Sequence, residues 1–192
     1  MKSVLLKCLV LILFFQSFAF TFNGPPDFHP RQLDREIRKI YHTDHFQIAY
    51  YPSSENQPDS NTGKYFSIYT GNTLAGYGYI GRVMSCRQGM CFSNLKNSKS
   101  SFAEYFDYFI LFDSTISIQK VMVFNYMASH GNEITSNGWL KQFIGYNGNN
   151  SLIAGKDIDA ISGATVSVHG LINDVIIRTS AIKKLKSEKK NF

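Results

Sequence analysis

Residues 104–113 (EYFDYFILFD) constrain the fold more than any other segment of the chain. Their aromatic and aliphatic side chains follow one another almost without interruption, whereas a strand with one face in water alternates apolar and polar residues. A strand of this composition has to be covered on both faces. We therefore expect residues 104–113 to form a central strand of a sheet, with other elements packed on each side.

Two further segments extend this strand into a sheet. Residues 116–127 (ISIQKVMVFNYM) predict a second strand, and Asp113-Ser114-Thr115 between the two suits a hairpin turn. Residues 74–83 (LAGYGYIGRV) alternate glycine with aromatic and aliphatic side chains, which is typical of a strand with close contacts to its backbone. Residues 52–64 are rich in Pro, Asn and Ser and predict a loop.

Helical periodicity lies mainly toward the two ends of the chain. Apolar residues at 33, 37, 40 and 41 predict a helix over 31–41, and residues 137–143 predict a short one. A long amphipathic helix is predicted from Gly163 onwards, because apolar residues recur at 164, 168, 171, 172, 175, 182 and 185. Strands in the middle and helices at the ends predict a single α+β domain with a central, mainly antiparallel sheet and flanking helices.

The first residues of the chain predict export. Lys2 opens a positive region, residues 8–15 (CLVLILFF) form an unbroken apolar run of eight, and residues 17–19 (SFA) suit cleavage after Ala19. This is the pattern of a secretory signal peptide over residues 1–19. The apolar run is short for a membrane span, which needs about 20 residues, and an uncleaved anchor is the alternative. We expect the protein in the periplasm or on the outer side of the cytoplasmic membrane.

Composition and charge divide the rest of the chain, from residue 20 onwards, into three segments. We assign residues 20–35 to a linker or N-terminal extension, because three of the five prolines lie in 20–30, residues 36–182 to the domain and residues 183–192 to a basic tail. The net charge of +6 comes from the signal region and this tail, so the body is neutral. A nucleic-acid-binding domain needs a basic face. We therefore expect no nucleic-acid partner, and from the tail only a weak contact with an anionic membrane surface.

Two cysteines, Cys86 and Cys91, remain once the signal peptide has removed Cys8. An even number in an oxidising compartment favours a disulfide that closes this small loop, and a redox-active pair is the alternative. The spacing does not suit haem attachment, and residues 42–45 (HTDH) suit a polar turn better than a metal site. The chain carries no Walker phosphate loop, GxSxG elbow or HExxH helix. We assign neither a metal site nor a catalytic residue.

Residues 159–165 (DAISGAT) carry the main functional signal. They form a turn of small residues that leads into the last helix, where unpaired backbone N–H groups and the helix dipole favour phosphate. Gly163 and Ala164 allow a close approach to the backbone, and Ser162 and Thr165 add hydroxyls. The alternative is an ordinary helix start, capped by Ser162 or Asp159.

The same segment resembles the attachment motif of the FMN-binding domain family, which includes subunits of the sodium-translocating NADH:quinone reductase and of the Rnf complex. That motif is Asp, a small residue, any residue, Ser or Thr, Gly, Ala, then Thr or Ser, and residues 159–165 fill every defined place. In the family a flavin transferase that uses FAD as donor esterifies the last hydroxyl to the phosphate of FMN. The resemblance thus implies covalent FMN on Thr165, with Ser162, Gly163 and Ala164 beside it. Asp159 then positions the phosphate-side loop or a Mg²⁺ ion used during transfer, or it only forms a turn.

The resemblance covers residues 74–182. Residues 76–79 resemble the glycine-and-aromatic strand of the family and 104–127 its central hairpin. Residues 130–135 (HGNEIT) stand where the family often has a His, a Glu-Thr pair and a Pro-Gly turn, but here Ile134 separates the pair and no proline follows. Residues 166–168 (VSV) likewise replace a commoner Thr-Ser pair. The resemblance implies flavin contacts from Glu133 and Thr135. His130 is either near the site or structural, and Trp139 either packs on the flavin ring or belongs to the core.

We therefore expect an exported flavoprotein that relays electrons between redox partner proteins of the cell envelope, after maturation by an FAD-dependent flavin transferase. No NADH site is recognisable, so an electron-transfer domain is expected rather than a stand-alone enzyme. Two alternatives stay open. One is a non-redox binding or assembly module of the envelope, and the other is an exported flavin-dependent reductase.

Overall fold

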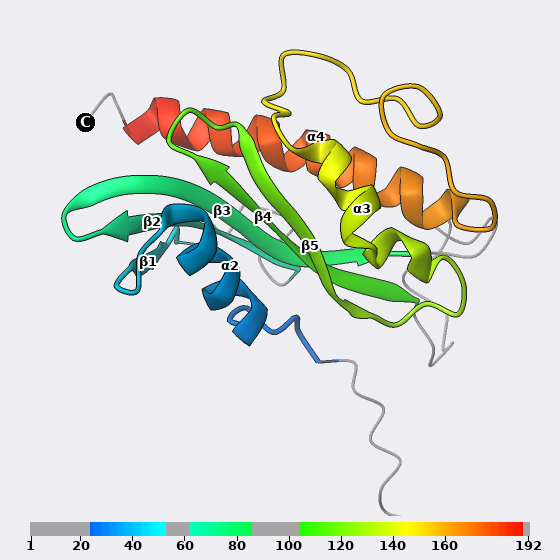
Figure 1. The fold of residues 1–192 in the computed structure, drawn as a ribbon, viewed down its shortest axis with the longest axis horizontal. Helices are drawn as coiled ribbons and strands as arrows, with labels where there is room; N and C mark the ends of the chain where they lie inside the picture. Colours follow the sequence, from blue (N-terminus) through cyan, green and yellow to red (C-terminus); the bar gives the residue numbers. More distant parts are fainter. Residues whose placement is uncertain (1–23, 53–61, 86–103, 190–192) are drawn as a thin grey trace, which may run out of the picture.

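The computed structural model describes residues 24–52, 62–85 and 104–189. A five-stranded sheet forms its centre (Figure 1), and each strand pairs antiparallel with the next one along the chain. The predicted α+β fold with a mainly antiparallel sheet is confirmed. The strands are β1 Gln47–Tyr50, β2 Gly63–Thr70, β3 Thr73–Met84, β4 Tyr105–Asp113 and β5 Ile118–Tyr126.

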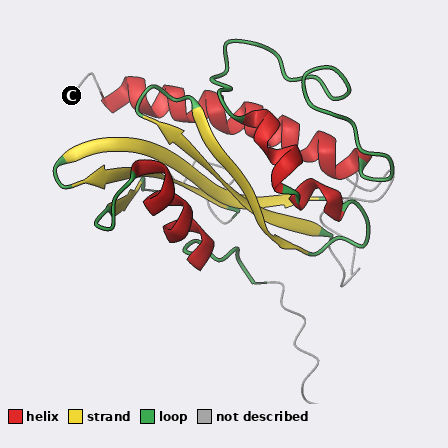
Figure 2. Cartoon of the chain, viewed as in Figure 1, coloured by secondary structure: helices red, strands yellow, loops and turns green. Residues whose placement is uncertain are grey.

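Helices cover both faces of this sheet (Figure 2). One face packs on α2 Arg31–Tyr41, whose Leu33 and Ile37 are fully buried. The other face packs on α4 Thr165–Lys189 and on the short helices that follow β5. These short elements are η2 Asn132–Thr135, α3 Asn137–Leu140 and η3 Lys141–Phe143.

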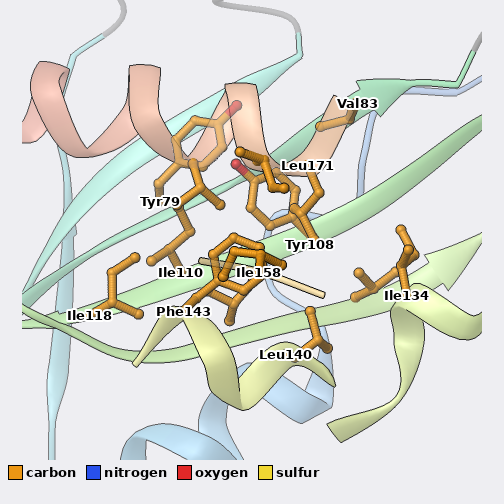
Figure 3. Packing of buried hydrophobic residues seen from close by; sticks show 14 of the residues in the cluster. Tyr79, Val83, Tyr108, Ile110, Ile118, Ile134, Leu140, Phe143, Ile158 and Leu171 are labelled. Carbon is orange, nitrogen blue, oxygen red and sulfur yellow. The ribbon is translucent and has the colours of Figure 1, made fainter. Parts of the chain in front are cut away.

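Strand β4 lies in the middle of these layers, as its composition predicted. Phe109 and Leu111 point to the α2 side, whereas Tyr108 and Ile110 point to the α4 side. Figure 3 shows Tyr108 and Ile110 within the larger core cluster, which also holds Leu171 of α4. Eight of the nine residues of β4 are buried, so the expectation of a strand covered on both faces is confirmed.

The hairpin between β4 and β5 is confirmed, with one shift in its boundary. The carboxylate of Asp113 accepts hydrogen bonds from the amides of Thr115 at 2.8 Å and Ser117 at 3.0 Å. This fold of the turn places Ile116 at a φ of +69°, in the left-handed region. A residue in that conformation cannot continue a pleated strand, so β5 begins at Ile118 rather than at 116.

Other boundaries also differ from the sequence expectations. Strand β1 was not predicted, and Gly63 and Lys64, assigned to a loop, begin β2. Helix α2 begins at Arg31, within the segment 20–35 that we assigned to a linker or extension. Helix α4 continues through residues 183–189 of the expected tail, since Ile182 and Leu185 still pack on the core.

Several sequence predictions fall outside the described residues. These are the signal peptide over 1–19 and the pairing of Cys86 with Cys91. None of the helices in the described ranges combines the length and apolar composition needed to cross a membrane.

Candidate functional site

The loop after β5 meets the start of α4 and brings together the two segments singled out in the sequence. Gly131 has a φ of +88°, and a Cβ added there would lie 3.2 Å from Cα of Ala164. Beside this contact is a hollow of about 550 Å³. Its lining combines Gly163 with residues from the end of β5 and the following loop: Tyr126, Ala128, Ser129, His130, Gly131, Asn132, Glu133 and Thr135.

A chain of hydroxyl groups holds this loop against α4. The Tyr126 hydroxyl donates to the carbonyl oxygen of His130, and it lies 2.9 Å from Oγ of Ser167. Oγ of Ser167 in turn lies 3.0 Å from Oγ of Ser85, and both serines are buried. The single hydroxyl proton of Tyr126 is used in the bond to His130. Ser167 therefore donates to Tyr126, and Ser85 donates to Ser167. These hydroxyl groups therefore connect the residue after β3 with β5 and α4 at one edge of the hollow.

The same hollow is ringed by polar groups. The hydroxyl of Ser129 donates to Oε1 of Glu104 and lies 2.9 Å from Nδ1 of His130. Because Ser129 has only one proton to give, Nδ1 of His130 is the donor in the second contact. Burial raises the pKa of the Tyr126 hydroxyl, and the charges of Glu104 and Glu133 raise it further, although the bond with Ser167 lowers it. Tyr126 thus remains a neutral donor near pH 7.

At the start of α4, the amides of Thr165, Val166 and Ser167 have no hydrogen-bond partner among the described residues. Gly163 has a φ of +81°, which is not helical, so the helix begins at Thr165 and not at Gly163 as expected. The first helical bond runs from the amide of Val168 to the carbonyl of Ala164 at 2.9 Å. Ser162 and Asp159 are exposed, and within the described ranges neither side chain caps the amides of this first turn. Thr165 is also exposed, so its hydroxyl and the neighbouring amides are open to a ligand.

Trp139 and Asp159 anchor the turn that leads to Thr165. Trp139 is only 7% exposed, and its ring centroid lies 5.4 Å from that of Phe143. Its Nε1–H donates to the carbonyl of Asp159 at 2.8 Å, and the amide of Asp159 donates to Oε1 of Gln142 at 2.9 Å. Trp139 therefore belongs to the core, as one interpretation had it, and it anchors the turn that leads to Thr165.

Among the described residues, the carboxylate of Asp159 has no hydrogen bond of the turn-forming kind that the sequence left open for it. In the preceding turn, Oδ2 of Asp157 accepts from the amide of Ile153 at 2.9 Å. The carboxylate of Asp159 is exposed, which leaves it able to act on a ligand or ion.

The structure places the remaining sequence candidates as follows. Glu133 and Thr135 are exposed and line the hollow, and His130 lies on its lining. In the expected polar turn, Oγ1 of Thr43 donates to the carbonyl of His45 at 2.8 Å. Among the residues that the structure describes, no group of three His, Cys, Asp or Glu side chains could hold a metal ion.

Sequence reasoning missed Tyr126, Ser129 and Ser167 as parts of this site. Tyr126 reads as one more aromatic residue of a strand, and Ser167 reads only as a departure from a motif. Their spacing along the chain gives no sign of the contact at 2.9 Å between them, because that contact depends on how α4 lies against the end of β5.

The residues present fit a flavin phosphate at Thr165. Three features lie close together here: the exposed hydroxyl of Thr165, the uncapped amides of a long helix, and the hollow that Gly163 lines. The volume of this hollow is within about 300–1,000 Å³, the range usual for ligand sites. No known family model matches the chain, and no curated protein matches it. The functional inference accordingly depends on the residues themselves.

Proposed function

We propose that this protein is an exported flavoprotein with FMN joined to Thr165 by a phosphoester, and that it relays electrons in the cell envelope. The observation that carries the proposal is the position of Thr165. It is exposed, it begins a 25-residue helix, and it stands two residues after Gly163, which lines a polar hollow. That is the position at which the resemblance of residues 159–165 to a flavin attachment motif requires an accessible hydroxyl.

Each part of the site has a task in this proposal. The amides at the start of α4 stabilise the negative charge of the phosphate, and the first turn of the helix holds no acidic residue that would repel it. Gly163, at a φ of +81° and with open space where a Cβ would stand, lets the phosphate approach the backbone. The hollow beside it, with Glu133, Thr135 and His130 on its lining, is the space for the ring system.

Attachment follows from the chemistry of FAD. The Thr165 hydroxyl loses its proton and forms a bond to the phosphorus of the FMN half, while the bond to the AMP half breaks and AMP leaves. An FAD-dependent flavin transferase catalyses this step, and its product carries electrons in one-electron and two-electron steps. Redox partner proteins of the envelope supply and accept those electrons. A relay is proposed rather than a complete reductase because nothing in the sequence resembles an NADH site.

The experiment is co-expression with a flavin transferase in an exporting host. We expect a band that fluoresces on a denaturing gel, and an intact mass equal to the mature chain plus FMN minus water. Thr165→Val keeps the shape of the side chain but removes the nucleophile, and should abolish both signals while the far-UV circular dichroism stays unchanged. Thr73→Val, at an exposed position in β3, is the matched control and should stay flavinylated.

Three results would contradict the proposal. A fluorescent Thr165→Val band would place the attachment elsewhere. Wild-type protein with the mass of the polypeptide alone, made beside an active transferase, would favour a non-redox module of the envelope. Turnover of a small-molecule acceptor by the flavinylated protein, without a partner protein, would instead favour a flavin-dependent reductase.

A further inference from the structure

A second hollow, of about 720 Å³, lies on the face of the sheet that α2 covers. Asn125 lines it, whereas the next residue, Tyr126, lines the hollow beside α4. Successive residues of a strand point to opposite faces, as Asn125 and Tyr126 do here, so the two hollows are separate sites on the two sides of β5. The lining consists of Pro25, Asp27, Pro30, Arg31, Gln32, Arg35, Arg82, Tyr105, Asp107, Phe124 and Asn125.

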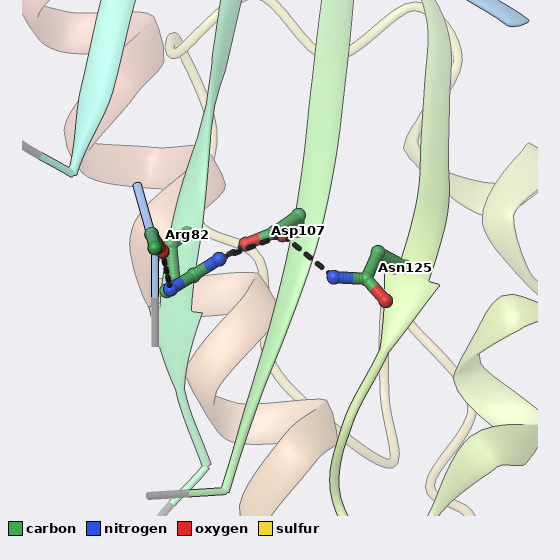
Figure 4. A network of polar contacts seen from close by, with 4 residues as sticks. Arg82, Asp107 and Asn125 are labelled. Atoms are coloured by element: carbon green, nitrogen blue, oxygen red, sulfur yellow. Dashed lines mark hydrogen bonds and ion pairs between the residues drawn. The ribbon is translucent and has the colours of Figure 1, made fainter. Parts of the chain in front are cut away.

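A fixed arginine forms part of this lining. Arg82, Asp107 and Asn125 stand in one row across β3, β4 and β5 (Figure 4). Arg82 donates through Nε to one carboxylate oxygen of Asp107 at 2.7 Å, and through Nη2 to the other at 3.0 Å. Its Nη1 donates to the carbonyl of Gly24 at 2.8 Å, and its guanidinium carbon lies 3.6 Å from the centroid of the Tyr105 ring.

These contacts leave two N–H groups of Arg82 available to a ligand. A guanidinium has five N–H groups, and the bonds to Asp107 and Gly24 use three of them. One N–H on each of Nη1 and Nη2 therefore has no acceptor within the described ranges. The orientation of the group is already fixed by three bonds and a stacked ring, so a ligand would bind it with little further loss of side-chain entropy.

The lining of this hollow holds three arginines against two acidic residues, Asp27 and Asp107, so its net charge is positive. Asp107 is only 1% exposed, and its carboxylate is taken up by Arg82 and by Asn125, which donates to it at 2.8 Å. Arg31 and Arg35 stand four residues apart, on one side of α2. Arg31 has no ion pair among the described residues, and Arg35 shares the single charge of Glu36 with Lys120, at 3.5 and 3.7 Å.

Apolar surface completes the lining. The rings of Tyr105 and Phe124 and the two prolines Pro25 and Pro30 stand beside the arginines. A ligand that matches both parts needs a negatively charged group for the arginines and an apolar body for the rings. An inorganic anion would leave the apolar part without a partner.

From this arrangement we infer a binding site for a small organic carboxylate with an apolar or aromatic body. The carboxylate pairs with Arg31 and Arg35 and accepts from Arg82, and the body packs on Tyr105 and Phe124. The site is independent of flavin attachment, because the two hollows share no lining residue.

The test uses the mature protein and benzoate as probe, followed by NMR of the backbone amides and of the arginine Nε–H groups. We expect saturable shifts that include Arg82 and Asn125. Benzamide, which has the same ring without the charge, should bind at least about tenfold more weakly, as should benzoate to the double variant Arg31→Gln/Arg35→Gln. Lys39→Gln is the matched control, since Lys39 is an exposed cation of α2 that does not line the hollow.

Three outcomes would overturn the inference. The first is equal binding of benzoate and benzamide, which would show a site without charge selectivity. The second is saturation by inorganic phosphate but not by benzoate, with the same dependence on Arg31 and Arg35, which would show an anion site without an apolar part. The third is the absence of saturable shifts among the lining residues.

Discussion

Replacing Asp107 by Asn should destabilise the protein far more than the loss of an ordinary surface charge. Asp107 lies in the middle of the sheet, where its side chain is almost fully buried and accepts three hydrogen bonds, two from Arg82 and one from Asn125. Asn keeps the shape but offers one acceptor and no charge. The guanidinium of Arg82, 13% exposed, would then be left without its counter-ion.

The magnitude follows from that burial. Breaking a buried ion pair by removing one partner costs about 3–5 kcal/mol, because the remaining charge stays in a poorly solvated place. We expect about 3 kcal/mol, since Asn still accepts one bond and Arg82 keeps its bond to Gly24 at 2.8 Å. A domain of this kind has a free energy of unfolding of about 5–15 kcal/mol, so the variant should still fold.

Urea unfolding followed by far-UV circular dichroism measures this loss. With a urea dependence of about 2 kcal/mol per molar, the midpoint should fall by about 1.5 M. The control is Asp44→Asn, because Asp44 is 89% exposed and pairs with Arg38 at 3.8 Å, an arrangement worth less than about 1 kcal/mol. The double variant Arg82→Met/Asp107→Leu removes both charges and should recover much of the loss. Equal midpoints for Asp107→Asn and Asp44→Asn would refute the reasoning.

Two further predictions concern the turn of the hairpin and the loop beside α4. Burial raises the pKa of Asp113, but hydrogen bonds from Thr115, Ser117 and Gln119 outweigh it and lower the pKa below its ordinary value. Asp113 therefore stabilises the protein above a pH of about 4 and loses this effect as its carboxylate is protonated. The difference in urea midpoint between wild type and Asp113→Asn should be larger at pH 7 than at pH 3. An equal difference at the two pH values would contradict these hydrogen bonds. Gly131→Ala should lower the free energy of unfolding by about 1–3 kcal/mol, since φ is +88° and the new Cβ would lie 3.0–3.2 Å from Tyr126, Ser167 and Ala164. The control is Gly138→Ala in α3, where the new Cβ meets open space. Similar urea midpoints for the two variants would be inconsistent with this packing.

The elements that the sequence predicted are those with a strong local pattern. Residues 104–113 are apolar throughout, and the helices over 31–41 and from the 160s onwards repeat apolar residues at helical spacing. Such patterns are properties of one segment, and they stay readable whatever the segment contacts. The turn at Asp113 is similarly local, because within the described part of the chain its carboxylate bonds only to residues two to six positions further on.

The missed strands and shifted boundaries depend on partners that lie far along the chain. Strand β1 is four residues long and has meaning only in register with β2. In β3 the sequence indicated a close approach to the backbone, but only the fold shows that the ring of Phe66 occupies the space over Gly78, where a Cβ would lie 2.2 Å from it. Pairing of this kind is decided between strands and not within them.

The candidate site likewise has one part that the local sequence determines and another that depends on packing. The order of residues in 159–165 and their place before an amphipathic helix identify Thr165 as a hydroxyl at a helix start, and they do so within seven consecutive residues. The hollow beside it could not be predicted, because it exists only where Gly131 meets Ala164 and where Tyr126 reaches Ser167, across 33 and 41 positions of the chain. Local sequence determines which groups a helix start offers, whereas the packing of α4 against the sheet decides what lies next to them.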